Sequence, residues 1–559
     1  MKRFLSLLLT VIMVIPMLAV AAMAEEAPMV IDFYDDAANY HGIQTGWFAK
    51  VVKDRFNIEL NIIAPQVAGE SVYATRAADG NLGDVLIMDK SKFVNCIEAG
   101  LVKDISDRVL EIENLKPFHQ QIEAYNASLN KGEGVYYGIP AEMVNTSAVG
   151  VTGEMIYSSP QVRWDLYKAV GSPDVKDLDG LLDLLAKIHE IHPANENGDP
   201  AYPISLWPDW DNNDNMSGPA NVVQLTTWYG DKLKGAAMLK PDNTFVKLYD
   251  KDSGYYKITK FLNKAYQMGL VDPESFEQDW NAFVGKLQNG QVDLIWYSWQ
   301  QGFWNSQDRM DNGTAFQVIP VEDAMFYADA DNFFGSSRVW GIGSKVEGEK
   351  YEKILEFLNW YASPEGLTFQ HCGIEGLNYI VGEDGKYIPY KDNALMDNLP
   401  VPEEFGGGGY QDGNNAINQW LCGSICLNPN TGETYDQKYW ASYIAKNMTE
   451  MKKEWQARFD AQDPVDWMKK NNKIVISPNC VANLATDTND IELLRNEINK
   501  VLCKYTWQMF AAETDDEFEA LWAKMVDEMD GLDYQTLFDY DCQKWQVEVD
   551  AKIAAVAAQ

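Results

Sequence analysis

The segment 342–379 constrains the fold of this chain more than any other stretch of its sequence. Residues 349–362 carry apolar side chains at helical spacing, and Pro364 ends this predicted helix because the residue before a proline is pushed out of the α region. Residues 373–379 (GIEGLNY) then place two glycines around Glu375. Because glycine lets the backbone turn tightly or approach a ligand closely, this loop is suited to present an acidic and an aromatic side chain to a cleft.

Strand-like and helix-like segments alternate along the chain, which indicates an α/β fold. A predicted helix at about 46–55 separates the first two strand-like runs. The strand-like runs are 30–33, 58–62, 84–88, 293–297 and 316–319. With 559 residues, the chain exceeds one comfortable hydrophobic core, so we expect two or more domains.

Five further segments, together with 342–379, closely resemble the family 1 extracellular solute-binding proteins of bacterial ABC importers, in the same order. They are 78–85 (ADGNLGDV), 100–107 (GLVKDISD), 137–140 (YGIP), 162–171 (VRWDLYKAVG) and 261–273 (FLNKAYQMGLVDP). The likeness is strongest to the large, oligosaccharide-binding, lipoprotein-like branch. It implies a two-lobe periplasmic-binding-protein type II fold with the ligand cleft between the lobes. In such folds, ligands lie beyond the carboxyl ends of parallel strands.

The resemblance also implies how the chain divides. Lobe 1 is expected at 25–145 and is re-entered at about 315–365. Lobe 2 is expected at 146–314 and is completed by about 366–559, including the C-terminal helices.

The first 24 residues have the pattern of a secretory signal peptide, with a basic start, an apolar run and Ala22-Met-Ala24 as a cleavage site. We therefore expect an extracytoplasmic protein, secreted or periplasmic. Many relatives carry a lipid-attachment cysteine after the cleavage site, whereas the first cysteine here is Cys96, so no lipid anchor is expected. A formal net charge of −37 disfavours nucleic acid as a partner.

Motifs for catalysis and for cofactors are missing from the sequence, which contains no P-loop, nucleophile elbow or dinucleotide fingerprint. His189 and His192 lie three residues apart but lack a third metal ligand nearby. The loop 195–203 is similar to a calcium loop of the family, but Ala201 and Tyr202 replace its acidic pair. We expect no cofactor, with calcium at this loop as the alternative.

Aromatic residues are abundant, with 18 tryptophans and 28 tyrosines, and several tryptophans lie in polar, turn-rich stretches. Flat aromatic faces cover the C–H faces of sugar rings, while polar side chains satisfy the hydroxyls. For a single tryptophan, a core role is as plausible as a sugar-binding role. The candidate ligand-binding residues are Tyr40, Trp47, Glu142 and Asn145 in lobe 1, Trp207, Trp210, Trp296 and Trp299 in lobe 2, and Arg338, Trp340, Glu375 and Tyr379 near the crossover.

The predicted function is that of an extracytoplasmic solute-binding subunit of an ABC importer. It captures an oligosaccharide between its lobes and delivers it to permease transmembrane subunits on separate chains, acting as a monomer and not as an enzyme. A secreted carbohydrate-active enzyme with paired carboxylates is the alternative, and an adhesin or sensory module is a third interpretation. Only nine arginines are present, of which Arg76, Arg163 and Arg338 lie in segments able to reach the cleft, so we favour a neutral sugar.

Overall fold

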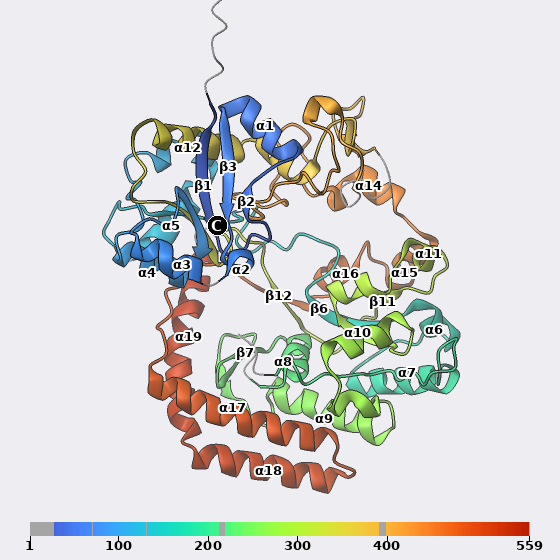
Figure 1. Ribbon diagram of the computed structural model, residues 1–559. Helices are drawn as coiled ribbons and strands as arrows, with labels where there is room; N and C mark the ends of the chain where they lie inside the picture. Colours follow the sequence, from blue (N-terminus) through green and yellow to red (C-terminus); the bar gives the residue numbers. More distant parts are fainter. Residues whose placement is uncertain (1–26, 70, 130, 212–217, 391–397, 558–559) are drawn as a thin grey trace, which may run out of the picture.

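The computed structural model describes residues 27–557 except 70, 130, 212–217 and 391–397, and it shows two lobes (Figure 1). The predicted signal peptide, 1–24, lies outside the described residues. No helix in the described part of the chain is both long enough and apolar enough to cross a membrane.

Lobe 1 is built on a six-stranded sheet with the strand order β2-β3-β1-β4-β13-β5. The strands are β1 (Met29–Asp35), β2 (Gly42–Ile43), β3 (Ile58–Ile63), β4 (Val85–Asp89), β5 (Gly138–Pro140) and β13 (Arg338–Ile342). β1 is parallel to β3 and β4, whereas β13 runs antiparallel between β4 and β5. Four consecutive buried residues begin β4, because helices cover both faces of this sheet.

Helices α1 (Trp47–Phe56) and α12 (Gly348–Tyr361) pack on one face of this sheet, and α4 (Lys90–Glu98) packs on the other. The helices predicted at 46–55 and 349–362 are thus confirmed to within one residue. α5 (His119–Ser128) contributes residues to the cores on both faces.

Lobe 2 contains a smaller antiparallel sheet in which β6 (Ser158–Arg163) lies between β10 (Leu294–Tyr297) and β11 (Phe316–Val318). Its core also includes the helices α6 (Trp164–Ala169), α7 (Leu178–Ile191), α8 (Ala220–Thr226), α9 (Gly254–Gln267) and α10 (Trp280–Gln288). A small sheet of β7 (Lys232–Lys234), β8 (Ala237–Leu239) and β9 (Phe245–Lys247) lies beside α8.

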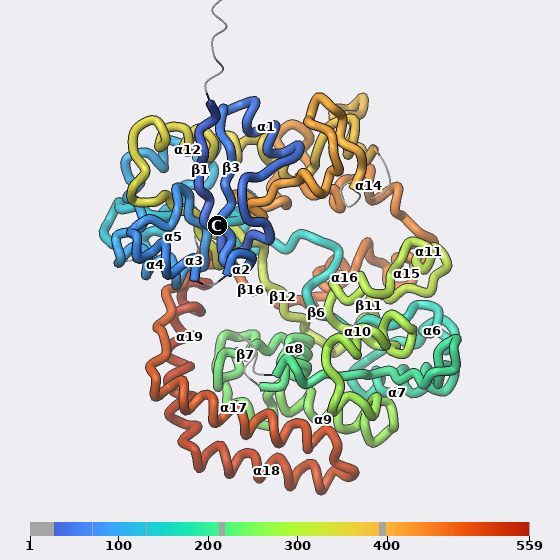
Figure 2. Tube along the Cα trace, viewed as in Figure 1, coloured from blue at the N-terminus to red at the C-terminus, as the bar shows by residue number. Residues whose placement is uncertain are grey.

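Two C-terminal helices, α17 (Asn489–Phe510) and α18 (Asp515–Gly531), lie on the side of lobe 2 away from lobe 1, and a third, α19 (Tyr534–Ala557), runs from there to lobe 1 (Figure 1). α19 begins in the lobe 2 core with Tyr534 and Leu537, and near its end Ala555 belongs to the lobe 1 core. The lobes are also joined by residues 141–157 and by the parallel pair β12 (Phe326–Asp329) and β16 (Ile474–Ser477) (Figure 2).

The structure differs from the predicted division after residue 366. Leu367, Tyr410 and Trp440 pack in the lobe 1 core, and the next core residue that belongs to lobe 2 is Met451. The reason is long-range packing, since Tyr410 stacks on Trp47 of α1 with ring centroids 5.2 Å apart. The segment from about 366 to 440 is therefore an extension of lobe 1.

Candidate functional site

One edge of the lobe 1 sheet faces lobe 2 (Figure 1). The parallel strands β1 and β4 end at this edge with Asp35 and Asp89, and the antiparallel strand β13 begins there with Arg338. Carboxyl ends of parallel strands are where open α/β sheets bind ligands. We call these strand ends, together with the residues that directly follow or precede them, the lobe 1 edge.

Asp35 is fully buried at the lobe 1 edge. Its Oδ1 accepts a hydrogen bond from the backbone N–H of Ala37 at 2.8 Å, whereas Oδ2 has no partner among the described residues. Burial raises the pKa of this carboxyl group to about 7, although the Ala37 N–H and the nearby Arg338 guanidinium act in the opposite direction. Asp35 is therefore a carboxyl group with a free acceptor directly beneath the lobe 1 edge.

Two cations of the lobe 1 edge, Arg338 and Lys92, have acidic neighbours. Arg338 Nε lies 3.9 Å from the Asp89 carboxylate, and its side chain is 37% exposed. Lys92 Nζ donates to both carboxylate oxygens of Asp36 at 2.9 Å. This edge therefore presents mixed donors and acceptors without an excess of positive charge.

Glu142 and Asn145 follow β5 and hold the extension of lobe 1 against the sheet. The backbone N–H of Glu142 donates to the carbonyl of Trp420 at 2.8 Å, and Asn145 Oδ1 accepts from the N–H of Leu427 at 2.9 Å. The Glu142 side chain is half-buried, and Nε1 of the half-buried Trp420 has no partner among the described residues.

Lobe 2 carries a continuous group of aromatic side chains, which we call the aromatic cluster. Its members are Trp207, Trp210, Trp280, Phe283, Trp296, Tyr297, Trp299 and Phe303, connected ring to ring. Trp207 and Trp296 are fully buried and stack with centroids 5.3 Å apart and planes 3° apart. Trp210, Trp280 and Trp299 lie above them, and all three are at least partly exposed.

Local structure explains how this outer layer reaches the surface. β10 ends at Tyr297 because Gln300 Oε1 accepts the backbone N–H groups of Trp296 and Tyr297, and this turn leaves Trp299 37% exposed. Asp279 caps α10 by accepting the N–H of Ala282 at 2.8 Å, which fixes Trp280 as the first helical residue.

The end of β10 also determines which side of lobe 2 the cluster occupies. Tyr297 pairs with Ser158, the first residue of β6, and the chain enters β6 directly from the segment 141–157 that comes from lobe 1 (Figure 2). The exposed Tyr157, just before β6, packs edge-on against Tyr297 at 5.3 Å. The aromatic cluster is therefore at the end of the lobe 2 sheet where the chain arrives from lobe 1.

The structure brings together several of the residues predicted for the site. Trp207, Trp210, Trp296 and Trp299 all belong to the aromatic cluster. Arg338, Glu142 and Asn145 lie on the neighbouring strands β13 and β5 or directly after β5. Tyr40 is exposed in the loop after β1, where its hydroxyl donates to the Ile43 carbonyl at 2.6 Å.

Four of the predicted residues lie elsewhere. Trp47 and Trp340 are core residues, since Trp47 Nε1 donates to the Tyr410 carbonyl and Trp340 packs between Phe33 and Tyr361. The remaining two belong to the loop 373–379: Tyr379 is buried against Tyr387 and Trp440, and Glu375 is exposed.

Trp280, Tyr157, Tyr297 and Asp35 were missed by the sequence reasoning. Trp280 lies in a polar stretch (EQDWNA), the same signal that selected Trp210, so it could have been found. No local signal distinguishes Tyr157 or Asp35, because only the strand ends place them at the site.

The loop 195–203 closes on itself, because Asn195 Oδ1 accepts the backbone N–H groups of Asn197 and Asp199 at 3.0 and 2.9 Å. Within the described residues, no group of three or more His, Cys, Asp or Glu side chains is arranged to hold a metal ion. His189 stacks on Tyr202, and His192 Nδ1 lies 3.0 Å from the buried carboxylate of Asp293. Both histidines therefore have structural contacts.

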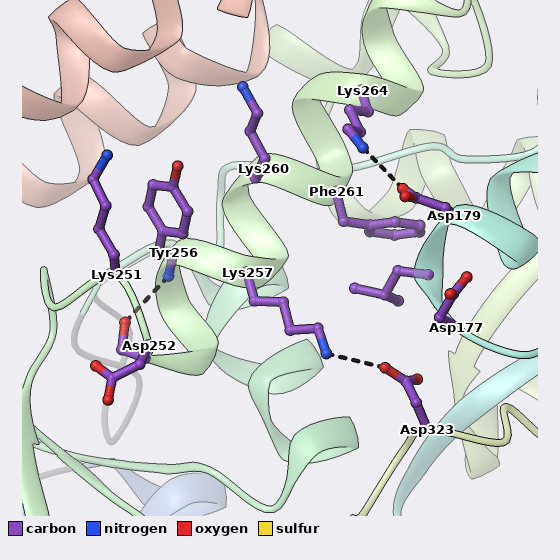
Figure 3. Close-up of a pocket in the computed structure, with 12 residues that line it drawn as sticks. Asp177, Asp179, Lys251, Asp252, Tyr256, Lys257, Lys260, Phe261, Lys264 and Asp323 are labelled. Atoms are coloured by element: carbon purple, nitrogen blue, oxygen red, sulfur yellow. Dashed lines mark hydrogen bonds and ion pairs between the residues drawn. The ribbon is translucent and has the colours of Figure 1, made fainter.

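A cavity of about 370 Å³ lies away from these surfaces, between α7, α9 and the turn before α9 (Figure 3). Four lysines line it, and each pairs with an acid at 2.6 to 3.2 Å. The pairs are Lys251–Glu519, Lys257–Asp323, Lys260–Asp515 and Lys264–Asp179. Lys260 and Lys264 of α9 thus pair with acids of α18 and α7, and all four lysines of the cavity are engaged, whereas Asp177 and Asp252 also line it; among the described residues, the cavity has no unpaired lysine to offer an anionic ligand.

Comparisons with known proteins agree with this architecture. No family model matches the sequence. The curated relative FusA, a fructooligosaccharide ABC transporter substrate-binding protein of Streptococcus pneumoniae, is 23% identical over 265 residues. That match spans 44% of this chain and 44% of FusA, less than half of either protein.

Two solved structures share the fold over nearly the whole chain. Alginate-binding protein AlgQ2 without calcium ion superposes with a TM-score of 0.55 at 15% identity, over 93% of this chain and 98% of AlgQ2. The Streptococcus pneumoniae FusA complex with kestose gives a TM-score of 0.55 at 13% identity, over 92% and 99%. The chain therefore shares the α/β, two-lobe fold of these solved structures, and the fold predicted from the resemblance of its motifs is confirmed.

Proposed function

We propose that this protein is an extracytoplasmic solute-binding subunit of an ABC importer, which captures an oligosaccharide between its lobes and delivers it to a membrane permease. The observation that carries the proposal is the pairing of two unlike surfaces in a two-lobe fold. The lobe 1 edge offers charged and polar groups, and the aromatic cluster offers flat apolar rings. The names of the similar proteins, which bind fructooligosaccharide or alginate, support the same class of ligand.

The two surfaces match the two kinds of surface on a sugar chain. Exposed rings such as Trp299 suit the apolar C–H faces of sugar units. Carboxylate and guanidinium groups such as Asp89 and Arg338 suit the hydroxyl rims, since carboxylates accept and guanidinium groups donate.

Closure of the lobes would join the surfaces around the ligand. The connections that would bend include the segment 141–157, the pair β12–β16 and α19, which contributes residues to the cores of both lobes. A ligand that contacts both lobes binds the closed form better than the open form and shifts the population toward it. The permease would then recognise the closed form.

The test is binding without turnover. In isothermal titration calorimetry against kestose, maltotriose and a mixture of milk oligosaccharides, we expect a saturable signal for at least one of them. Trp210→Ala should weaken that binding about tenfold or more, as loss of a stacking anchor does.

The matched control is Trp545→Ala, a half-buried tryptophan on α19 covered by Lys234. It should bind as the wild-type protein does. Appearance of hydrolysed sugar in the titration cell would instead favour a secreted carbohydrate-active enzyme with paired carboxylates.

A further inference from the structure

We infer that the site takes an uncharged oligosaccharide and rejects uronate-containing or sulfated chains. This inference rests on the proposed function and specifies the substrate class of the same site. The fold alone does not decide the charge of the ligand. Alginate is a polyanion and kestose is neutral, yet a protein named for the first and a protein solved with the second share the fold. The charges that line the two surfaces of this chain decide between them.

The aromatic cluster has acids, not cations, at its rim. The backbone N–H of Trp280 points to the Asp209 carboxylate, 3.1 Å from each oxygen. The residue directly before Trp280 is a second acid, the helix cap Asp279. The nearby arginines of lobe 2 are used elsewhere, because Arg163 and Arg309 both lie over Trp304, which lies outside the cluster. An anionic sugar on these rings would meet repulsion and no compensating cation.

At the lobe 1 edge, the cations already have neighbours within the protein. Lys90, directly after β4, donates to Ser128 Oγ at 2.8 Å and lies over the Tyr125 ring. Lys92 has both oxygens of Asp36, and it also donates to the Tyr34 hydroxyl at 2.8 Å. Arg338 lies between Asp89, at 3.9 Å, and Asp35, whose carboxyl group it stabilises in the charged form. A ligand carboxylate would have to share that one guanidinium with two protein carboxyl groups.

A second arginine of lobe 1, Arg76, lies on the helix Ser71–Ala78 and is already paired. Arg76 donates to the carboxylate of Asp32 at 2.8 Å. Arg163 pairs with Asp165 at 2.7 Å. Each of the three arginines in segments able to reach the cleft, Arg76, Arg163 and Arg338, therefore has an acidic neighbour. The donors of Arg76 and Arg163 are thus engaged within the protein, whereas Arg338 Nε is 3.9 Å from Asp89, too far for a hydrogen bond, so Arg338 is the arginine whose role the experiment must test.

The same arrangement fits a neutral sugar. A hydroxyl group donates one hydrogen bond and accepts others, so neighbouring hydroxyls are satisfied by a guanidinium beside a carboxylate. Arg338 with Asp89 is such a pair, and both side chains are exposed. With a formal net charge of −37, the whole protein also repels an approaching anion at low salt.

The experiment presents fluorescently labelled protein to a glycan array that contains both neutral and acidic oligosaccharides, at low and at high sodium chloride. We expect binding to one group of neutral glycans, with little change on adding salt. Binding to uronate or sulfated glycans alone, weakened by salt, would overturn the inference while supporting the proposed function. Binding to no glycan would overturn both.

A pair of variants tests the mechanism. Arg338→Gln should weaken binding of the neutral ligand about tenfold, by the same factor at both salt concentrations, because it removes hydrogen bonds to hydroxyls and no ligand charge. Arg108→Gln removes an exposed guanidinium paired with Glu352 on the same lobe and should leave binding unchanged. A loss for Arg338→Gln that shrinks strongly as salt is added would show that Arg338 clamps an anion.

Discussion

Replacement of Asp541 by alanine should destabilise lobe 2, because this carboxylate fixes α19 to the rest of the lobe. Asp541 is fully buried and accepts two hydrogen bonds from the Arg495 guanidinium, both at 2.7 Å. It also accepts the backbone N–H of Ala236, in the turn between β7 and β8, at 2.6 Å. One side chain thus joins α17, α19 and the small sheet of lobe 2.

The size of the effect follows from what the substitution leaves behind. The Ala236 N–H would be buried without an acceptor, which costs about 1–3 kcal/mol. Arg495 would keep Asp487, to which it donates at 2.7 Å, so only part of the usual 3–5 kcal/mol for breaking a buried ion pair is lost. We therefore expect a total loss of about 3 kcal/mol and a melting temperature lower by roughly 5 °C or more.

The assay is calorimetric thermal unfolding of Asp541→Ala beside Asp550→Ala. Asp550 is an exposed residue of α19 whose one described contact is with Gln546 at 2.9 Å. Both substitutions raise helix propensity equally, so the difference between them isolates the buried contacts. If the two variants melt within a degree of each other, the reasoning about Asp541 is wrong.

Three further predictions concern the site and its surroundings. Trp207→Ala should lower the free energy of unfolding by about 3–5 kcal/mol, because Trp207 is fully buried. Trp299→Ala should instead weaken sugar binding and change the free energy of unfolding by less than about 1 kcal/mol, because Trp299 is exposed. Equal stability losses in urea unfolding would refute the distinction between buried and exposed tryptophans of the aromatic cluster. The raised pKa of Asp35, from 3.8 to about 7, means that the folded protein binds this proton more tightly than the unfolded chain, so the contribution of Asp35 to stability is greatest at low pH and is lost as pH rises through the folded pKa. Wild type should thus lose about 1 kcal/mol between pH 6 and 8 that Asp35→Asn does not lose, and parallel pH curves would contradict this. Millimolar calcium and a chelator should both leave the melting temperature unchanged, because the loop 195–203 already closes through Asn195; a calcium-dependent rise would restore the calcium alternative.

Local patterns were sufficient to predict much of the fold. The helix expected at 349–362 is α12, Gly348–Tyr361, because its apolar spacing and the following Pro364 are properties of adjacent residues. The strand-like runs near residues 30, 58 and 84 became β1, β3 and β4 of one sheet. The division after residue 366 was not predictable in this way, since it depends on contacts such as that between Trp47 and Tyr410, 363 positions apart.

The same limit applies to the site. Trp210 and Trp340 were both predicted to contact ligand, yet one lies in the partly exposed layer of the aromatic cluster and the other in the core between Phe33 and Tyr361. Whether a tryptophan contacts ligand or core depends on which strand edge or helix start presents it. Sequence spacing alone does not specify that.

Hydrogen–deuterium exchange with and without the oligosaccharide selected on the array tests most directly whether a sugar is held between the lobes. The account predicts that the ligand slows exchange simultaneously at the lobe 1 edge, in residues 35–40 and 142–145, and at the aromatic cluster, in residues 297–303. The paired acids and lysines around the α9 cavity should be unaffected. Protection confined to one lobe, or centred on the cavity lined by Lys257, would contradict capture between the lobes.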